Sequence, residues 1–264
     1  MEVKNICEQV CAIALNVGDF IRNERADFSL EKVKDKGLNQ LVSYVDVTAE
    51  NKLVEELRKV LPEAGFITEE ETQDDTTKEY KWIIDPLDGT TNFIHGLPCY
   101  SISIALMKGD EVIVGVVYEV NRNENFYAWK GGGAYMNGQP IQTSKATRLK
   151  DSLLATGFPY YDFGQMQDYL KVLEILMQRT HGLRRFGSAA VDLAYTACGR
   201  FEGFFEYGLS PWDVAAGTLI VQEAGGKVTD FSGNNDYIFG REIVAGATGM
   251  YNEFLGVIKG EFKK

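Results

Sequence analysis

Two carboxylates, Asp85 and Asp88, come directly after an apolar run of the sequence, Trp82–Ile84. This run predicts a buried strand, which Pro86 should end because proline has no N–H to donate to a sheet. Gly89 then allows a tight turn, and the three polar residues that follow it are candidates to cap a short helix. The free N–H groups at the start of such a helix would suit an anion.

Carboxylates beside an anion-binding helix end would repel a phosphate unless cations lay between them. Proteins bind Mg²⁺ through a few carboxylates together with the phosphate oxygens of a substrate. The stretch therefore suggests metal-assisted phosphate chemistry. A strand followed by a capped acidic turn without a chemical role explains the same residues, and the stretch alone leaves that alternative open.

The composition is that of an ordinary globular protein with an excess of acidic residues. The chain has 264 residues, enough for one large domain or two small ones around a buried core. Its 38 acidic residues outnumber 27 basic ones and give a formal net charge of −11. That balance argues against nucleic acid or an anionic membrane surface as the main partner.

The sequence shows no segment that we would read as a signal peptide or a membrane span. Glu2, Lys4 and Glu8 interrupt the apolar core that a signal peptide needs. No apolar run approaches the ~20 residues required to cross a bilayer. The four cysteines include no C-x-x-C pair and favour small buried thiols. We therefore expect a cytoplasmic protein.

The elements of the first half can be expected from hydrophobic periodicity. The apolar spacing predicts an amphipathic helix over 3–21, and a polar connection over 27–39 separates it from a strand over 41–47. A second helix should follow, capped by Asp46 or Thr48 and ended by the next proline. Further strands are expected over 66–67, 82–84, 100–107, 112–120 and 125–129.

The second half of the chain alternates between helices and strands. Strands are expected over 153–156, 201–207, 227–231 and 243–247. Helices are expected over 166–177, 189–198 and 211–223, and at the end of the chain. From this pattern alone, we predict packed layers of mixed α and β structure.

Three separate segments resemble the signatures of one family. The stretch WIIDPLDGTTNF, residues 82–93, is similar to the first signature of the inositol monophosphatase family, within the lithium-sensitive, Mg²⁺-dependent phosphatase superfamily. Trp212–Gly217, continuing to Glu223–Gly226, resembles a second signature, and Gly65–Glu70 resembles a third. The matches occur in the family order, so together they are far more specific than any one of them.

This resemblance implies both a fold and an activity. The fold would be of the α+β class, a layered α-β-α-β-α sandwich of the inositol monophosphatase-like, or carbohydrate phosphatase, type. Residues 1–264 would form one domain of two packed halves, about 1–150 and 151–264, with the site between them. The activity would be Mg²⁺-dependent hydrolysis of inositol 1-phosphate to myo-inositol and phosphate by a metal-activated water. Two or three Mg²⁺ ions per site, inhibition by Li⁺ and a homodimer belong to the same expectation.

By the resemblance, acidic oxygens from three distant parts of the chain meet around the metals. Glu69 and Asp85 would bind a first metal together with the backbone carbonyl of Leu87. Asp88 and Asp213 would hold a second metal, and the carboxylate of Asp85 would bind both metals. Hard oxygen ligands of this kind suit Mg²⁺.

The resemblance also assigns Glu69, Thr90 and Asp46 to catalysis. The hydroxyl of Thr90 would lie near the attacking water, and Asp46 matches an aspartate that pairs with this threonine. Lys36 matches a basic residue that faces the third metal or the phosphate. Lys34 lies two positions away, and the segment NQLVS that follows departs from the usual family wording.

Residues on the substrate side follow from the same resemblance. Gly89 and Thr90 would offer N–H groups to the phosphate, and Glu206 matches a glutamate that contacts inositol hydroxyls. Gly187–Ala189 matches a substrate-lining Gly-Thr-Ala segment, with Ser188 in place of the threonine. The implied substrate-binding set is Asp88, Gly89, Thr90, Thr91, Gly187, Ser188, Ala189, Glu206 and Asp213.

Other functional assignments stay open at this point. The D-G-T-T-N-F run differs from the D-G-T-K-E-F typical of the nucleotide phosphatases, which favours inositol monophosphate as the substrate. The first alternative is a related phosphatase for a 3′(2′),5′-bisphosphate nucleotide, fructose 1,6-bisphosphate, NADP or histidinol phosphate. The second is a regulatory interaction protein on the same fold, although the intact carboxylate set argues against it. Arg184 and Arg185 either meet the substrate or serve fold and dimer contacts.

Overall fold

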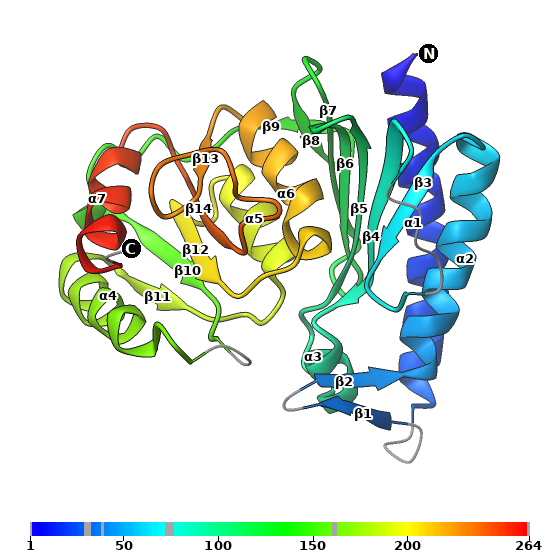
Figure 1. The fold of residues 1–264 in the computed structure, drawn as a ribbon, viewed down its shortest axis with the longest axis horizontal. Coiled ribbons are helices and arrows are strands. Elements are labelled where there is room, and N and C mark those ends of the chain that lie inside the picture. Colours follow the sequence, from blue (N-terminus) through cyan, green and yellow to red (C-terminus); the bar gives the residue numbers. More distant parts are fainter. Residues whose placement is uncertain (1, 29–32, 38–39, 72–76, 160–162, 263–264) are drawn as a thin grey trace.

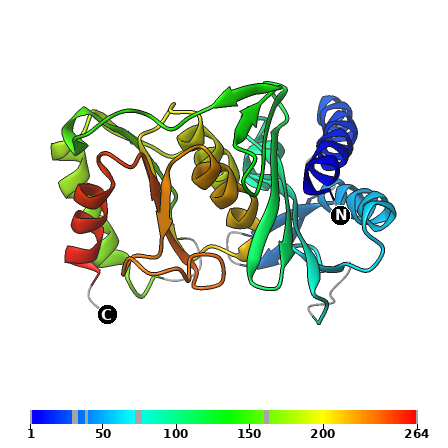
Figure 2. The same ribbon diagram turned by 90° about the horizontal axis from the view of Figure 1, so that it is seen from above.

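The computed structural model describes residues 2–28, 33–37, 40–71, 77–159 and 163–262. Within them, two large β-sheets have helices between them and further helices on both outer faces (Figure 1). Figure 2 shows the same succession of layers from above. The order of helix, sheet, helix, sheet and helix confirms the predicted α-β-α-β-α sandwich of the α+β class.

The larger sheet is built from β3 (Gly65–Thr68), β4 (Tyr80–Asp88), β5 (Ser101–Lys108), β6 (Glu111–Glu119), β7 (Glu124–Trp129), β8 (Ala134–Met136) and β9 (Gln139–Ile141). Its strands lie in chain order, β3-β4-β5-β6-β7-β8-β9. β3 runs parallel to β4, and each later pair is antiparallel. Antiparallel neighbours can be joined by short turns, which explains the meander from β4 onwards.

The smaller sheet is built from β10 (Leu153–Thr156), β11 (Gly182–Arg184), β12 (Gly203–Tyr207), β13 (Lys227–Thr229) and β14 (Glu242–Gly246). Its order is β11-β10-β12-β14-β13. β10 is parallel to both neighbours, and β14 is antiparallel to both of its own. Helical connections between the parallel strands bring α-helices onto the faces of this sheet.

Three pairs of helices form the helical layers. α1 (Val3–Ala26) and α2 (Tyr44–Val60) cover the outer face of the larger sheet, and α4 (Met166–Arg179) and α7 (Tyr251–Glu261) cover that of the smaller. α5 (Ala189–Ala197) and α6 (Pro211–Glu223) fill the space between the sheets. The remaining elements are β1 (Val33–Gly37) paired with β2 (Gln40–Ser43), the short α3 (Thr90–His95) and the 3₁₀ turn η2 (Leu149–Asp151).

Strand alternation divides the apolar side chains among three cores, because successive side chains of a strand point to opposite faces. On β5, Ile102, Ile104 and Leu106 belong to the core shared with α1 and α2. Ala105 and Met107, between and beyond them, belong to the central core around α5 and α6. A third core lies between the smaller sheet and its outer helices.

The central helices are buried on nearly every side. All nine residues of α5 are buried, and α6 is buried from Val214 to Val221. Small side chains let these helices touch the sheets: a Cβ added at Gly115 on β6 would lie 2.5 Å from the carbonyl oxygen of Ala216. A helix that is apolar all round belongs to such an interior layer. Any charged side chain on it therefore requires an explanation.

The junction before α2 differs from the expectation. Strand β1 occupies part of the segment expected to be a polar connection, and the strand expected over 41–47 ends at Ser43. Ser43 caps α2, because its Oγ accepts a hydrogen bond from Val45 N (3.1 Å). Asp46, expected as a possible cap, is instead the third helical residue and accepts from Ser43 N (2.8 Å), which completes a capping box.

Two details of the first signature segment, residues 82–93, were also predicted wrongly. Pro86 does not end the strand: β4 continues to Asp88 because its pairing with β5 shifts register between Asp85 and Asp88. This irregularity accommodates the missing N–H of proline. The cap of α3 is not one of the polar residues but Gly89, whose φ of 94° is a conformation that favours glycine.

No helix within the described ranges is long and apolar enough to cross a membrane. The two large sheets come from residues 65–141 and 153–246. They therefore separate near residue 150, where the predicted halves meet, although the assignment of one domain with two halves stays a prediction.

Candidate active site

A cavity of about 960 Å³ is lined by the ends of β4 and β12 and the first turns of α3, α5 and α6. Residues from both large sheets and from the central helical layer therefore meet there. The described side chains that line it include eight acidic groups and two basic ones: Glu69, Glu70, Glu71, Asp85, Asp88, Asp192, Glu206 and Asp213, with Arg185 and Arg241.

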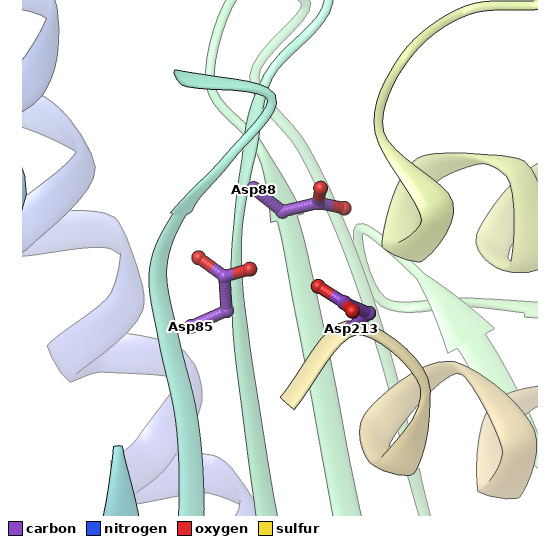
Figure 3. A group of neighbouring side chains, drawn as sticks. All are labelled: Asp85, Asp88 and Asp213. Carbon is purple, nitrogen blue, oxygen red and sulfur yellow. The ribbon is translucent and has the colours of Figure 1, made fainter. Parts of the chain in front are cut away.

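Three of these carboxylates converge at one point, as Figure 3 shows. Asp85, Asp88 and Asp213 each offer a carboxylate oxygen, and the three oxygens lie within 4.8 Å of one another. Asp85 is buried and the other two are half-buried. The end of β4 supplies two of them, and the first turn of α6 supplies the third. The fold thus joins the first and second signature segments of the sequence.

Local hydrogen bonds hold each member of this acidic triad, which we define as Asp85, Asp88 and Asp213. Asp85 Oδ1 accepts from Leu87 N (2.9 Å). Asp88 Oδ2 accepts from Ser188 Oγ and from Ala190 N, each at 2.7 Å. Asp213 Oδ2 accepts from Ser210 N (2.6 Å), where Pro211 begins α6. Each of these hydrogen bonds involves only one of the two oxygens of its carboxylate.

Burial dominates the electrostatics of the triad. Desolvation and then the charges of Glu69 and Asp88 raise the pKa of Asp85 well above its usual range. Desolvation raises the pKa of Asp88 to about 6 against the hydrogen bonds from Ser188 and Ala190. Desolvation and the charge of Asp88 raise the pKa of Asp213 to about 7. Ionised together, these groups repel one another, which a cation among them would relieve.

The donor set of the triad therefore fits a hard divalent cation. It offers clustered carboxylate oxygens from rigid elements, and the cavity holds more acidic than basic side chains. Glu69 lies beside the triad: its backbone N donates to Ile84 O (3.2 Å) on β4. Desolvation and then the charge of Asp213 raise the pKa of its carboxyl well above the usual range. Glu69 thus reaches the same acidic centre from the end of β3.

Thr90 and Asp46 meet on the α2 side of the cavity. Thr90 Oγ1 lies 2.9 Å from Asp46 Oδ1 and 3.0 Å from Leu87 O, and its single proton can be donated to either acceptor. Asp46 is fully buried, and its other oxygen accepts from Ser43 N and Ser43 Oγ. The capping box of α2 thus fixes the carboxylate that orients the Thr90 hydroxyl.

The Gly187–Ala189 segment lies directly beside the end of β4, because a Cβ added at Gly89 would lie 3.2 Å from the carbonyl oxygen of Gly187. Ser188 is the N-cap of α5: its Oγ accepts from Val191 N (3.3 Å) and also donates to Asp88. This one residue therefore joins the start of α5 to the acidic triad. Gly89, Thr90 and Thr91 line the same cavity at the start of α3.

Glu206 reaches the cavity from the end of strand β12. Desolvation raises the pKa of its carboxyl well above the usual range, the charge of Asp213 raises it further, and the Arg185 guanidinium lowers it. Gly157 makes room for this side chain, because a Cβ there would lie 1.9 Å from Glu206 Oε1. The structure therefore brings every predicted site residue with a described side chain to, or directly beside, one cavity. Lys36 lies on β1, but its side chain is outside the described part of the chain.

Two features of this cavity were not predicted: Asp192 lines it from α5, and Gly157 gives space to Glu206. Arg185, whose role was left open between substrate and fold or dimer contacts, lines the cavity and packs its guanidinium 5.5 Å from the ring centre of Phe158. Helical spacing could have indicated Asp192, because it lies four residues after Ser188 and so on the same face of the predicted helix. No sequence signal indicated Gly157.

Comparison with known proteins agrees with this geometry. The sequence profile of the inositol monophosphatase family matches residues 2–258, and the chain belongs to this family. It is 41% identical over 249 residues to the protein named Nus factor SuhB of Escherichia coli strain K12, covering 94% of this chain and 93% of that one. It is 38% identical over 247 residues to a protein of Mesorhizobium japonicum named inositol-1-monophosphatase, covering 93% of each.

A solved structure has the same fold. The crystal structure of the extragenic suppressor protein suhB from Bartonella henselae superposes with a TM-score of 0.90 at 38% identity. The match covers 98% of this chain and 99% of that one. The relatives thus carry two kinds of names, one for a phosphatase and one for a factor, on a single fold.

Proposed function

We propose that this protein is a Mg²⁺-dependent phosphomonoesterase that hydrolyses inositol monophosphates, with inositol 1-phosphate giving myo-inositol and phosphate. The observation that carries the proposal is the acidic triad, whose oxygens lie within 4.8 Å of one another beside the Asp46–Thr90 pair. Family membership supports phosphatase chemistry. The name of the Mesorhizobium japonicum relative supports the substrate.

The metals would be held by Glu69, Asp85, Asp88, Asp213 and the carbonyl of Leu87. When bound, Mg²⁺ neutralises phosphate charge and lowers the pKa of water. The backbone N–H groups of Gly89 and Thr90 would bind the phosphate. Carboxylate and carbonyl oxygens suit Mg²⁺, and the free N–H groups at a helix start suit a phosphate.

Side chains of the protein would assist the attack of water on the phosphorus atom. The Thr90 hydroxyl, held by Asp46, would orient the water, and the Glu69 carboxylate would accept its proton. The new P–O bond forms as the bond to the alcohol oxygen breaks. The alkoxide takes a proton from solvent, so that the products are the free alcohol and inorganic phosphate.

A phosphate-release assay tests this function directly. Protein stripped of metal by a chelator should be inactive on inositol 1-phosphate, and added Mg²⁺ should restore turnover. The panel includes fructose 1,6-bisphosphate, NADP, histidinol phosphate and a 3′,5′-bisphosphate nucleotide, so that a preference for one of them would reassign the substrate. Full turnover in excess chelator would contradict the metal chemistry altogether.

Three further properties complete the proposal. We expect Li⁺ to inhibit by replacing Mg²⁺ among Asp85, Asp88 and Asp213, which a Li⁺ titration at fixed Mg²⁺ measures. We also expect a cytoplasmic homodimer, by resemblance to the family, and sedimentation gives its mass. Two or three Mg²⁺ ions per site would appear as the stoichiometry of calorimetric titration.

A second candidate is a regulatory interaction protein on the same fold, because the Escherichia coli relative is named a Nus factor. The net charge of −11 argues against direct binding of nucleic acid as its means. Asp213→Asn separates the two candidates. In a strain whose own copy is deleted, the variant should fail to restore growth if hydrolysis is the function. Full restoration of growth by a variant that releases no phosphate would establish the regulatory interaction function instead.

A further inference from the structure

The cavity extends beyond the acidic triad to a second group of charged side chains, Asp192, Glu206 and Arg185. We call this group the alcohol end of the cavity, because the phosphate of a bound substrate would lie at the triad. Asp192 belongs to the first turn of α5, and Glu206 to the end of β12. The family resemblance gives Glu206 a role here, contact with inositol hydroxyls, but gives Asp192 none.

Asp192 is an exception within its helix. Its side chain is 1% exposed, and the other eight residues of α5 are buried alanine, valine, leucine, tyrosine and threonine. Asp192 Oδ1 has no hydrogen-bond partner within the described part of the chain. A buried carboxylate oxygen without a partner is unfavourable, because it has lost its hydration and gained no compensating hydrogen bond. This oxygen has almost no accessible surface, but the residue lines the cavity, so a turn of the carboxyl group would bring the oxygen to a bound ligand that supplies the missing donor.

The surrounding charges indicate which kind of donor fits. Burial, followed by the charges of Glu206 and Asp88, disfavours the ionised form of Asp192 and raises its pKa well above the usual range. The Arg185 guanidinium acts in the opposite direction on both Asp192 and Glu206. One guanidinium therefore balances two carboxyl groups. A second phosphate would be repelled here, whereas neutral hydroxyl groups would donate hydrogen bonds without adding charge.

We propose that Asp192 is a specificity residue that accepts a hydrogen bond from a hydroxyl of the substrate alcohol, so that Asp192 and Glu206 together recognise two hydroxyls of a neutral polyol. This proposal rests on the proposed function and deepens it. It predicts a monophosphate of a polyhydroxylated ring as the substrate class and disfavours bisphosphates. Asp192 touches no reacting atom, and its contribution is to hold the alcohol in position.

The decisive experiment pairs residue deletion with hydroxyl deletion. Rates are measured for wild type, Asp192→Ala and Asp192→Asn on inositol 1-phosphate, on analogues that each lack one ring hydroxyl, and on p-nitrophenyl phosphate. Asp192→Ala should lower kcat/KM for inositol 1-phosphate about ten- to a hundredfold, the cost of leaving a buried substrate hydroxyl without its hydrogen-bond partner. Asp192→Asn keeps an acceptor oxygen and should recover part of the loss. p-Nitrophenyl phosphate, which has no ring hydroxyls, should be hydrolysed at nearly the wild-type rate.

One deoxy analogue should identify the hydroxyl that Asp192 binds. Wild type should lose about as much kcat/KM on that analogue as Asp192→Ala loses on the parent compound, and the variant should lose no more on it. Asp230→Ala is the matched control: Asp230 is a buried carboxylate whose Oδ1 binds the backbone of Ser232 and Asn234. This control should lower thermal stability without changing the ratio of rates on the two esters.

The outcomes separate this proposal from the proposed function. If wild type with Mg²⁺ hydrolyses neither ester, the phosphatase assignment itself is wrong. If it hydrolyses both and Asp192→Ala lowers both rates equally, Asp192 supports the fold and the proposal is overturned. Additive losses on every deoxy analogue would overturn it as well. Should Asp192→Ala fail to fold, the same cycle with Asp192→Asn decides between these outcomes.

Discussion

The two ends of the cavity are built differently. At the acidic triad, which we call the metal end, Asp88 and Asp213 each accept hydrogen bonds from a helix start through one oxygen. Their positions are therefore set before any ligand binds. At the alcohol end, Asp192 Oδ1 has no partner within the described residues, and Glu206 occupies space that a glycine leaves open. The first end is therefore preorganised by the chain, whereas our proposal has the second end completed by its ligand.

This difference predicts two patterns of mutational effect. Changes at the metal end should lower the rates on all phosphate esters alike, because every ester presents the same phosphate. Changes at the alcohol end should depend on the hydroxyls of the substrate. Measuring each variant on both inositol 1-phosphate and p-nitrophenyl phosphate therefore tests the comparison at every step.

The largest effect is expected from the triad. Asp88→Asn and Asp213→Asn each remove a charged ligand with little change in shape, and each should lower kcat more than about a hundredfold on both esters, beyond the range typical of residues that only support a ligand. The double variant should lose little more than either single one, because the carboxylates act as a unit. Steady-state kinetics over a range of Mg²⁺ concentrations measures this. Near-normal turnover by either variant would remove that residue from the metal site.

A second effect concerns pH. Carboxylates bind metal in the ionised form, and the pKa values of Asp88 and Asp213 in the metal-free protein are raised to about 6 and about 7. Mg²⁺ affinity should therefore fall as pH falls below about 7, by up to about tenfold per pH unit for each proton that the metal must displace. Calorimetric titration in buffers of different ionisation enthalpy counts these protons. An affinity that stays constant between about pH 8 and about pH 6 would contradict the assignment of these two ligands.

The Thr90 hydroxyl should produce a smaller effect at the metal end. Thr90→Val removes the donor to Asp46 and should lower kcat about ten- to a hundredfold on both esters, with little change in stability. Ser43→Ala is the control. It removes the α2 cap together with the Ser43 Oγ donor to Asp46 and should cost about 1 kcal/mol of folding stability, while Ser43 N still donates to Asp46 and the Asp46–Thr90 hydrogen bond survives. If Ser43→Ala lowered kcat as much as Thr90→Val, the hydroxyl would have no separate role.

The metal end was also the easier one to predict from the sequence. Asp85 and Asp88 are three residues apart, and Asp213 follows Trp212 at a helix start, so short segments carry the information. The layered fold followed from the same resemblance. Even there, two local details were predicted wrongly: Pro86 lies within β4, and Ser43 rather than Asp46 caps α2. The sheet register and the helix start depend on tertiary pairing, which a short motif does not contain.

At the alcohol end, only Glu206 was assigned from the sequence. It lies on β12, Asp192 lies on α5 and Gly157 follows β10, so no single segment carries the arrangement. Asp192 occurs in an otherwise apolar helix, where one charged residue would ordinarily mark an exposed face. Only the packing of α5 between two sheets shows that this face is buried and borders the cavity.

The smallest expected effect is the most specific to the alcohol end. An alanine at Gly157 would place its Cβ 1.9 Å from Glu206 Oε1, so the carboxylate must move away from its position. The backbone at Gly157 is outside the positive-φ region, so the substitution adds no strain of its own. Gly157→Ala should lower kcat/KM for inositol 1-phosphate about tenfold, less than the loss expected when Glu206→Ala removes the carboxylate completely. The kcat/KM for p-nitrophenyl phosphate should change by less than about twofold.

Gly256→Ala on α7, where a Cβ meets nothing within 4 Å, is the matched control and should leave both rates unchanged. Equal losses on both esters would show that Gly157 supports the metal end instead. An unchanged rate on inositol 1-phosphate would show that the position of Glu206 does not govern recognition of the alcohol.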